Sequence, residues 1–152
     1  MEISLETSDN LTLRTATEDD KEFAYQAKRA AFREYVEQVW GWDEGKQRKL
    51  HNQRFAAQDF CVINLDGKDV GIMSVDLKSD SVFVNQLYIL PEHQTRGIGG
   101  RCMSIVVEEG DKLDLPIRLR VLKVNHRAVA FYERLGFTIT DETGTHFLMQ
   151  KV

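Results

Sequence analysis

The sequence predicts a mixed α/β fold, in which a central sheet of about seven strands is flanked by about four helices. Three observations lead to this prediction. A strand, a glycine-rich turn and an amphipathic helix follow one another around Gly97. A second helical stripe lies between Asn125, a good N-cap residue, and Gly136, which suits the position just after a helix. Asp66-Gly67 separates two apolar runs, as in a β-hairpin.

The first half of the chain predicts a strand, two helices and this hairpin. Leu11 to Arg14 alternates in polarity, as a strand does, and the acidic segment Thr17 to Asp20 suits the start of a helix. The apolar side of that helix is expected to carry Phe23, Ala27, Ala30, Ala31 and Tyr35. Trp40 to Asp43 should break it, with Asp43 capping a second helix through Phe55. The hairpin strands are expected at 60–65 and 70–77.

The second half predicts strands that alternate with two helices. Val82 to Leu90 is an apolar strand closed by Pro91, and the glycine-rich turn after it leads into a helix expected to end at Gly110. The second helix begins at Asn125. The remaining strands are expected at 117–122, 137–140 and 146–150.

The glycine-rich turn predicts a phosphate-binding site. Glycines allow the backbone to approach a ligand closely, and the free N–H groups of a first helical turn attract negative charge. No Lys-Ser or Lys-Thr pair follows Gly97, so this is not a nucleoside-triphosphate loop. Cys102 stands where a dinucleotide fingerprint needs its third glycine. A helix start with flexible glycines and no ligand is the alternative.

Three segments together resemble the GCN5-related N-acetyltransferase (GNAT) superfamily, whose members transfer acyl groups from acyl-coenzyme A. The first is the strand end from Leu87 to Glu92. The second is the signature Q/R-x-x-G-x-G/A, matched by Gln94, Gly97 and Gly99. The third, Asn125 to Phe137, has the spacing N-x-x-A-x-x-F-Y-x-x-x-G-F. The resemblance covers about the C-terminal half of the chain and implies the element order βααβββαβαββ.

The resemblance implies acetyl-CoA as the cosubstrate and assigns most of the site. Strand 82–90 should diverge from its neighbour, which frees backbone groups near Leu87 and Ile89 for the pantetheine amides. Asn125 would hold the pantetheine or order the loop, and Tyr132 would be the acid that protonates the coenzyme A sulfur. A buried core tyrosine is the alternative for Tyr132. The expected cofactor-binding residues are Leu87, Ile89, Gln94, Thr95, Arg96, Gly97, Ile98, Gly99, Gly100, Asn125 and Tyr132.

A general base is the part of the chemistry that the sequence does not supply clearly. Many members of the superfamily carry a carboxylate on the strand before the glycine turn, but Ser81 to Leu90 contains no Asp or Glu. A water chain or another element would then remove the proton. Glu142 and His146, near the last hairpin, are weak candidates, and a solvent-exposed acid and a strand histidine are the alternative.

The acceptor is expected to be a primary amine of a small molecule or peptide. In this superfamily the first two helices and the last hairpin flank the acetyl group, and here they bring Tyr35, Trp40, Trp42 and Asp43. Aromatic faces and a carboxylate would suit a cationic amine; the alternative is that both tryptophans pack the junction between two helices. An inactive acyl-CoA-binding sensor or interaction module, and an acyltransferase for longer acyl chains, stay open.

Composition sets the remaining expectations. The 152 residues, 42% hydrophobic and 29% charged, predict one globular domain over 1–152. The net charge is −4, yet residues 94–134 hold eight Lys or Arg against five acids, which suits a polyanionic cofactor rather than nucleic acid. Cys61 and Cys102 are expected to be buried thiols, and the four histidines lack metal-ligand spacing, so no metal is predicted.

Location and assembly are predicted only broadly. Met1 to Glu6 lacks the basic and apolar regions of a signal peptide, and no apolar run approaches the ~20 residues that span a bilayer. A cytoplasmic protein without a membrane partner is therefore expected. A homodimer is possible by analogy with relatives of this fold.

Overall fold

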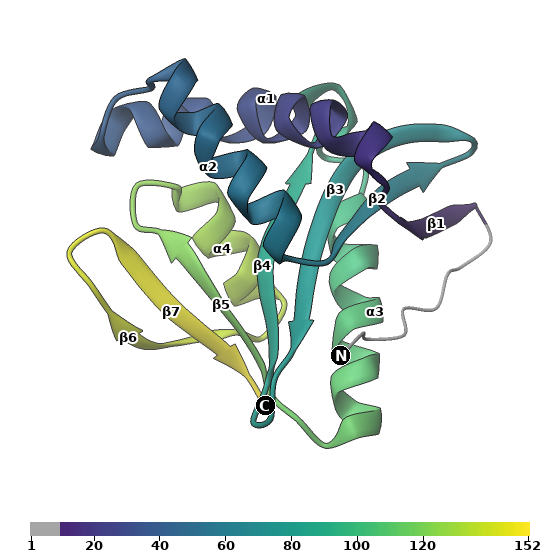
Figure 1. Ribbon diagram of the computed structural model, residues 1–152. Helices are drawn as coiled ribbons and strands as arrows, with labels where there is room; N and C mark the ends of the chain where they lie inside the picture. Colours follow the sequence, from purple (N-terminus) through teal and green to yellow (C-terminus); the bar gives the residue numbers. More distant parts are fainter. Residues whose placement is uncertain (1–9) are drawn as a thin grey trace.

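The computed structural model describes residues 10–152, whose centre is one seven-stranded sheet of order β1-β2-β3-β4-β5-β7-β6 (Figure 1). The strands are β1 Leu11–Thr15, β2 Phe60–Leu65, β3 Lys68–Leu77, β4 Val82–Ile89, β5 Ile117–Leu122, β6 Thr138–Glu142 and β7 His146–Lys151. The helices are α1 Lys21–Val39, α2 Glu44–Ala57, α3 Ile98–Leu113 and α4 His126–Arg134, with 3-10 turns at Glu18–Asp20 and Pro91–His93. The predicted fold class and element order are confirmed. Met1 to Glu6, the basis of the signal-peptide prediction, lies outside the described residues.

The sheet is antiparallel except at the junction of β4 with β5, and there it opens. Their parallel pairing joins only Val82–Val84 to Ile117–Leu119, whereas β4 continues to Ile89 and β5 to Leu122. The other edge of β4 stays paired with β3 from Val82 to Ile89, with one irregularity between Ser74 and Val75. The divergence of strand 82–90 from its neighbour is thus confirmed. It leaves backbone groups of β4 unpaired on the side of β5.

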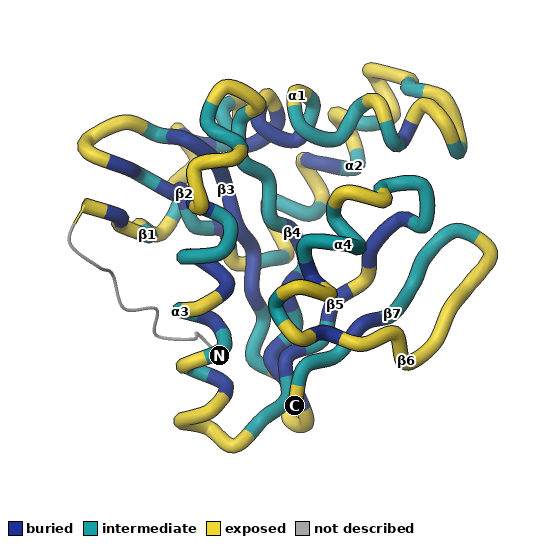
Figure 2. Tube along the Cα trace, turned by 180° about the vertical axis from the view of Figure 1, so that it is seen from behind, coloured by how far each residue is buried: buried dark blue, intermediate teal, exposed yellow. Residues whose placement is uncertain are grey.

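Two apolar clusters cover the two faces of the sheet. Ile72 and Met73 are neighbours in β3, so their side chains point to opposite faces. Ile72 packs with Ala24 and Ala27 of α1, and Met73 belongs to the cluster that contains Cys102 and Val106 of α3. Ala128, Val129 and Phe131 of α4 pack with the cluster that contains α3, and Figure 2 shows β6 exposed along its length.

Three details of the sequence prediction are wrong. Ala30 is exposed because the buried stripe of α1 runs instead through Ala24, Ala27 and Lys28, at the i, i+3, i+4 spacing of a helix face. The helix α3 does not end at Gly110, as predicted, but continues to Leu113, and Asp114 caps it in a left-handed conformation, φ 56°. A Cβ at Gly110 would lie 3.0 Å from the Leu115 carbonyl oxygen.

The third error concerns Cys61, which is only partly buried, whereas Cys102 is fully buried, and burial raises the pKa of its thiol to about 12. Neither cysteine takes part in a disulfide. Within residues 10–152, no helix is both long enough and apolar enough to cross a bilayer.

Candidate active site

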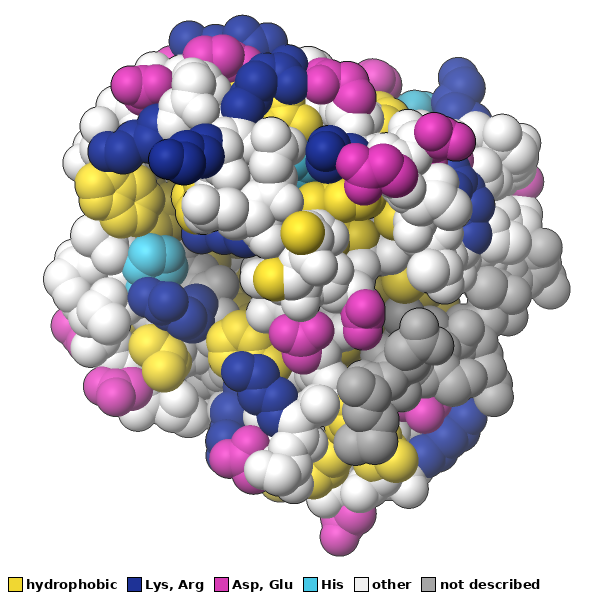
Figure 3. All heavy atoms as spheres, in the orientation of Figure 1, with side chains coloured by type: hydrophobic (Ala, Val, Ile, Leu, Met, Phe, Trp, Pro, Cys, Tyr) yellow, Lys and Arg dark blue, Asp and Glu magenta, His cyan; other side chains and the backbone are white. Residues whose placement is uncertain are grey.

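A cleft of about 1630 Å³ opens where β4 and β5 diverge. It is lined by α1 and α2 on one side and by the turn before α3, the first part of α3 and α4 on the other. Figure 3 shows this face of the molecule hollowed, with hydrophobic, Lys and Arg side chains around the hollow. The volume exceeds the roughly 300–1,000 Å³ of a pocket for one small ligand, so the cleft has room for two reactants.

One end of the cleft is built by the glycine-rich turn. Thr95 and Gly97 both have positive φ angles, 68° and 75°, which direct the chain sharply into α3 at Ile98. A Cβ at Gly100 would meet nothing within 4 Å, so the backbone there is open to the cleft. The N–H groups of the first helical turn have no carbonyl behind them in the helix, and they carry its positive pole. This arrangement favours a negatively charged ligand.

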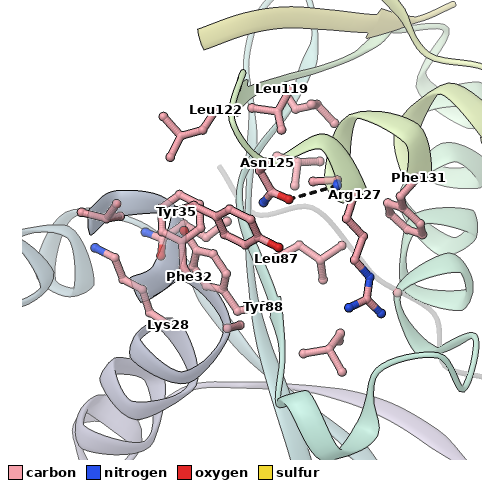
Figure 4. Close-up of a pocket in the computed structure, with 18 of the residues that line it drawn as sticks. Lys28, Phe32, Tyr35, Leu87, Tyr88, Leu119, Leu122, Asn125, Arg127 and Phe131 are labelled. Carbon is pink, nitrogen blue, oxygen red and sulfur yellow. Dashed lines mark hydrogen bonds between the residues drawn. The ribbon is translucent and has the colours of Figure 1, made fainter. Parts of the chain in front are cut away.

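The side chain of Gln94 hydrogen-bonds this turn to the end of β4 and to α4. Its side-chain Nε2 donates to the Ile89 carbonyl at 3.0 Å, and its Oε1 accepts from Arg127 at 2.9 Å. The turn, the end of β4 and the start of α4 are therefore held in one hydrogen-bonded unit. Arg127 consequently stands over the cleft beside Phe131, as Figure 4 shows.

The helix α4 supplies the polar groups between the diverging strands. Asn125 is its N-cap, and its side-chain oxygen accepts from the Ala128 N–H at 3.1 Å (Figure 4). Two turns later Tyr132 lines the cleft with its ring edge-on to Phe131 and Phe137. Burial, helped by the nearby Tyr88, raises the pKa of the Tyr132 phenol well above its usual range. The hydroxyl therefore holds its proton at neutral pH.

The structure places every predicted cofactor-binding residue around the cleft except one. Arg96 is exposed, does not line the cleft and contacts the ring nitrogen Nδ1 of His93 at 2.9 Å. The residues of the prediction that line the cleft are Leu87, Ile89, Gln94, Thr95, Gly97, Ile98, Gly99, Gly100, Asn125 and Tyr132. Their arrangement agrees with a cofactor site that runs from the glycine turn to the middle of β4.

Of the two candidate bases, His146 lies at the cleft and Glu142 does not. His146 lines the cleft with its ring 6.1 Å from that of Trp40, and burial, followed by Arg120, lowers the pKa of its imidazole. Glu142 is 62% exposed, binds Lys123 at 2.9 Å and does not line the cleft. Only His146 is placed where it could act on a ligand.

The two tryptophans also have different surroundings. The Trp42 ring lies 6.5 Å from the Tyr25 ring, tilted at 44°, and its N–H donates to Glu44, so the helix-junction interpretation applies to it. Trp40 is 61% exposed and lines the mouth of the cleft together with Tyr35 and Asp43. Figure 4 shows Tyr35 reaching from α1 toward Arg127 on α4.

Sequence reasoning missed the basic residues on the α1–α2 side. Lys28 lines the cleft although it is only 2% exposed, and Arg54 of α2 lines the same part. Of the residues that the structure describes, six Lys or Arg line the cleft, against two acids, Glu34 and Asp43. A signal for Lys28 existed in the sequence, because it continues the stripe of Ala24 and Ala27 at helical spacing.

No group of three or more His, Cys, Asp or Glu suited to a metal ion occurs among residues 10–152. The cleft is lined instead by backbone groups, aromatic rings and basic side chains.

Comparison with known proteins identifies the family. Residues 56–139, more than half of the chain, match the family described as "Acetyltransferase (GNAT) domain". The chain therefore belongs to the GNAT family of acetyltransferases. The predicted superfamily and the acetyltransferase class are confirmed by this match.

Individual relatives are more distant. Thialysine N-epsilon-acetyltransferase of Bos taurus is 34% identical over 71 residues, which are 45% of this chain and 42% of that enzyme. Spermidine N(1)-acetyltransferase of Thermoplasma acidophilum is 26% identical over 128 residues, 78% of this chain and 76% of that enzyme. The match thus spans less than half the length of the bovine enzyme.

Among solved structures, the PaiA N-acetyltransferase of Thermoplasma acidophilum in complex with coenzyme A has the same fold. The TM-score is 0.76 with 18% sequence identity, and the match covers 94% of this chain and 99% of that one.

Proposed function

We propose that the protein transfers an acetyl group from acetyl-CoA directly to the primary amine of a small molecule or a peptide. The observation that carries the proposal is the divergence of β4 from β5 next to the glycine turn. It leaves a row of backbone groups and the open start of α3 along one cleft. A long, polar carrier with a diphosphate at one end and amides along its arm fits that row.

The residues of the cleft fit coenzyme A part by part. The first turn of α3 would bind the diphosphate, since a ligand can approach the backbone at Gly100 without meeting a side chain. The free edge of β4 near Leu87 and Ile89 would bond the pantetheine amides. Arg127 adds positive charge beside this path. When bound, acetyl-CoA supplies the activated acetyl group.

Tyr132 is proposed as the proton donor to the departing thiolate. Its buried phenol keeps its proton at neutral pH, because the surroundings disfavour the phenolate. A backbone N–H of β4 between Leu87 and Ile89 would stabilise the oxyanion of the addition step. No carboxylate lies on β4, so the amine is proposed to lose its proton to water in the cleft, with His146 as the nearest alternative base.

The test is a screen of primary amines with acetyl-CoA that reads release of the free thiol. Acetylation of any amine in the panel, with the product verified by mass spectrometry, supports the proposal. Normal binding of acetyl-CoA without turnover of any amine would contradict it and favour the sensor interpretation. A homodimer and a cytoplasmic location stay predictions of the sequence.

A further inference from the structure

The far end of the cleft from the glycine turn contains a buried ammonium group that has no acidic partner among residues 10–152. Lys28 is 2% exposed, and its Nζ makes one long contact, 3.4 Å, to the side-chain oxygen of Gln47. Within residues 10–152 no Asp or Glu forms an ion pair with Lys28 or with Arg54. A buried cation without a counter-ion is costly, and proteins rarely keep one for structural reasons alone.

Arg54 increases the positive charge at the same place. Its guanidinium lies close enough to lower the pKa of Lys28, which burial lowers first, to about 8. Three glutamines line this end of the cleft as well: Gln47 bonds Lys28, and Gln86 donates to Gln58 at 3.2 Å. We call Lys28, Gln47, Arg54, Gln58 and Gln86 the Lys28 subsite.

The Lys28 subsite is separate from the proposed coenzyme path. Figure 4 shows Lys28 on the far side of Phe32 and Tyr35 from Arg127 and Phe131, with its ammonium pointing away from them. A diphosphate held at Gly100 therefore does not account for it. The acids that line the cleft, Glu34 and Asp43, do not neutralise it either, and the Asp43 carboxylate accepts from the Lys46 N–H at the start of α2.

We propose that the Lys28 subsite binds an anionic group of the acceptor, so that the substrate is an amine that also carries a carboxylate or a phosphate. This proposal rests on the proposed function and names the substrate class of that site. The anion would supply the counter-charge for Lys28 and Arg54, with the side-chain amide N–H groups of Gln47 and Gln58 as further hydrogen-bond donors. A polyamine would instead bring its cations against two like charges.

The first arm of the test compares matched amines. The rate of thiol release from acetyl-CoA is measured for standard amino acids and their neutral carboxamides, and for phosphoethanolamine and ethanolamine. In the wild-type protein the best acceptor should be one that carries a carboxylate or a phosphate. Its kcat/KM should be at least about tenfold above that of the matched amine without this group. The carboxylate and phosphate pairs decide which anion the subsite prefers.

Variants of Lys28 tie that preference to the subsite. Lys28→Met should bring the ratio of anionic to neutral kcat/KM close to one, and Lys28→Arg should keep most of it. Lys49→Met removes the same charge from an exposed position of α2 outside the cleft and should leave the ratio unchanged. A best acceptor that is neutral or polycationic, or a ratio that Lys28→Met does not change, overturns the proposal.

A second arm measures anion binding directly. It needs no turnover, so it tests the proposal even if no amine is acetylated. Succinate and inorganic phosphate are titrated by calorimetry into protein saturated with coenzyme A. Binding of either anion should weaken at least about tenfold in Lys28→Met while coenzyme A affinity stays the same. Absence of anion binding in the wild-type protein then overturns the proposal. If the protein is not an acetyltransferase, only the first arm fails. If the subsite does not bind an anion, the second arm fails as well, so the two cases can be told apart.

A third measurement separates the acceptor from the acyl donor. If succinyl-CoA reacts faster than acetyl-CoA in the wild-type protein and loses this advantage in Lys28→Met, the anion belongs to the acyl group. That outcome overturns the assignment to the acceptor.

Discussion

At the proposed coenzyme end of the cleft the binding groups would be backbone atoms, whereas at the proposed Lys28 subsite they would be side chains from three separate elements. The turn 94–100 and the free edge of β4 present N–H and C=O groups whose positions follow from local chain geometry. The Lys28 subsite depends on how α1, α2 and β4 pack together. The first end therefore suits a ligand common to the whole family, and the second can change its ligand by single substitutions.

The largest effect is expected from placing a negative charge at the coenzyme end. Gly100→Glu should weaken coenzyme A binding by roughly 1,000-fold, because like charges would meet at the first turn of α3. The side chain meets open space, so the protein should still fold. Calorimetry measures the affinity, and Gly144→Glu, in a turn with nothing within 4 Å, is the matched control. Normal affinity in Gly100→Glu would remove the diphosphate from this turn.

Tyr132→Phe tests whether Tyr132 acts in the chemical step rather than in cofactor binding. Loss of the proposed proton donor should lower kcat by about 100-fold and leave the affinity for acetyl-CoA within about twofold. Steady-state kinetics and calorimetry give the two values. Tyr25→Phe removes a buried phenol that bonds Glu44 outside the cleft, and its turnover should be normal. An unchanged kcat in Tyr132→Phe would leave that residue a purely structural role.

Lys28→Met should make the unliganded protein more stable, by roughly 2 kcal/mol at pH 7. Burial and Arg54 lower the pKa of Lys28 from 10.5 to about 8, so the folded protein binds this proton less tightly than the unfolded chain does. Wild-type stability should consequently rise, relative to the variant, as the pH rises from about 8 to about 10.5.

Chemical denaturation of both proteins across this pH range measures that difference. His51, whose pKa also responds to Lys28, is neutral throughout the window and contributes no slope. Equal stability of the two proteins at every pH would show that the Lys28 charge is balanced by a group that the structure does not place beside it.

The smallest effects concern the last hairpin. His146→Gln should change kcat/KM by only a few-fold, because water is the proposed proton acceptor. Glu142→Gln, which alters an exposed pair with Lys123, should change it less than about twofold. Rate measurements over a range of pH distinguish the roles. A loss of about 100-fold or more in His146→Gln, with loss of the lower limb of the pH profile, would make His146 the base.

The sequence predicted the chain geometry around the glycine turn and α4 in detail because its determinants are local. Glycine spacing, the N-cap Asn125 and the C′ Gly136 act within a few residues, and the structure has each of them where expected. Arg96 does not line the cleft, because its side chain turns outward to His93 at the sharp turn of Thr95 and Gly97, a direction that residue types alone do not fix.

The Lys28 subsite was not predicted from the sequence because its determinants are tertiary. Lys28 becomes buried only when α2 packs over α1, and its relation to Arg54 and Gln47 crosses two helices. The aromatic residues suggested a cationic acceptor, but the six basic residues around the cleft were spread along the chain and did not form a motif. Long-range charge balance of this kind is visible only in the folded molecule.

Calorimetric titration with coenzyme A and with pantetheine, which lacks the diphosphate and the adenosine 3′-phosphate, tests the central claim most directly, with Gly100→Glu reporting on the diphosphate. If the first turn of α3 binds the diphosphate, coenzyme A should bind the wild-type protein at least about 100-fold more tightly than pantetheine. In Gly100→Glu the two affinities should become similar. Equal affinities of the wild-type protein for both compounds would contradict the account.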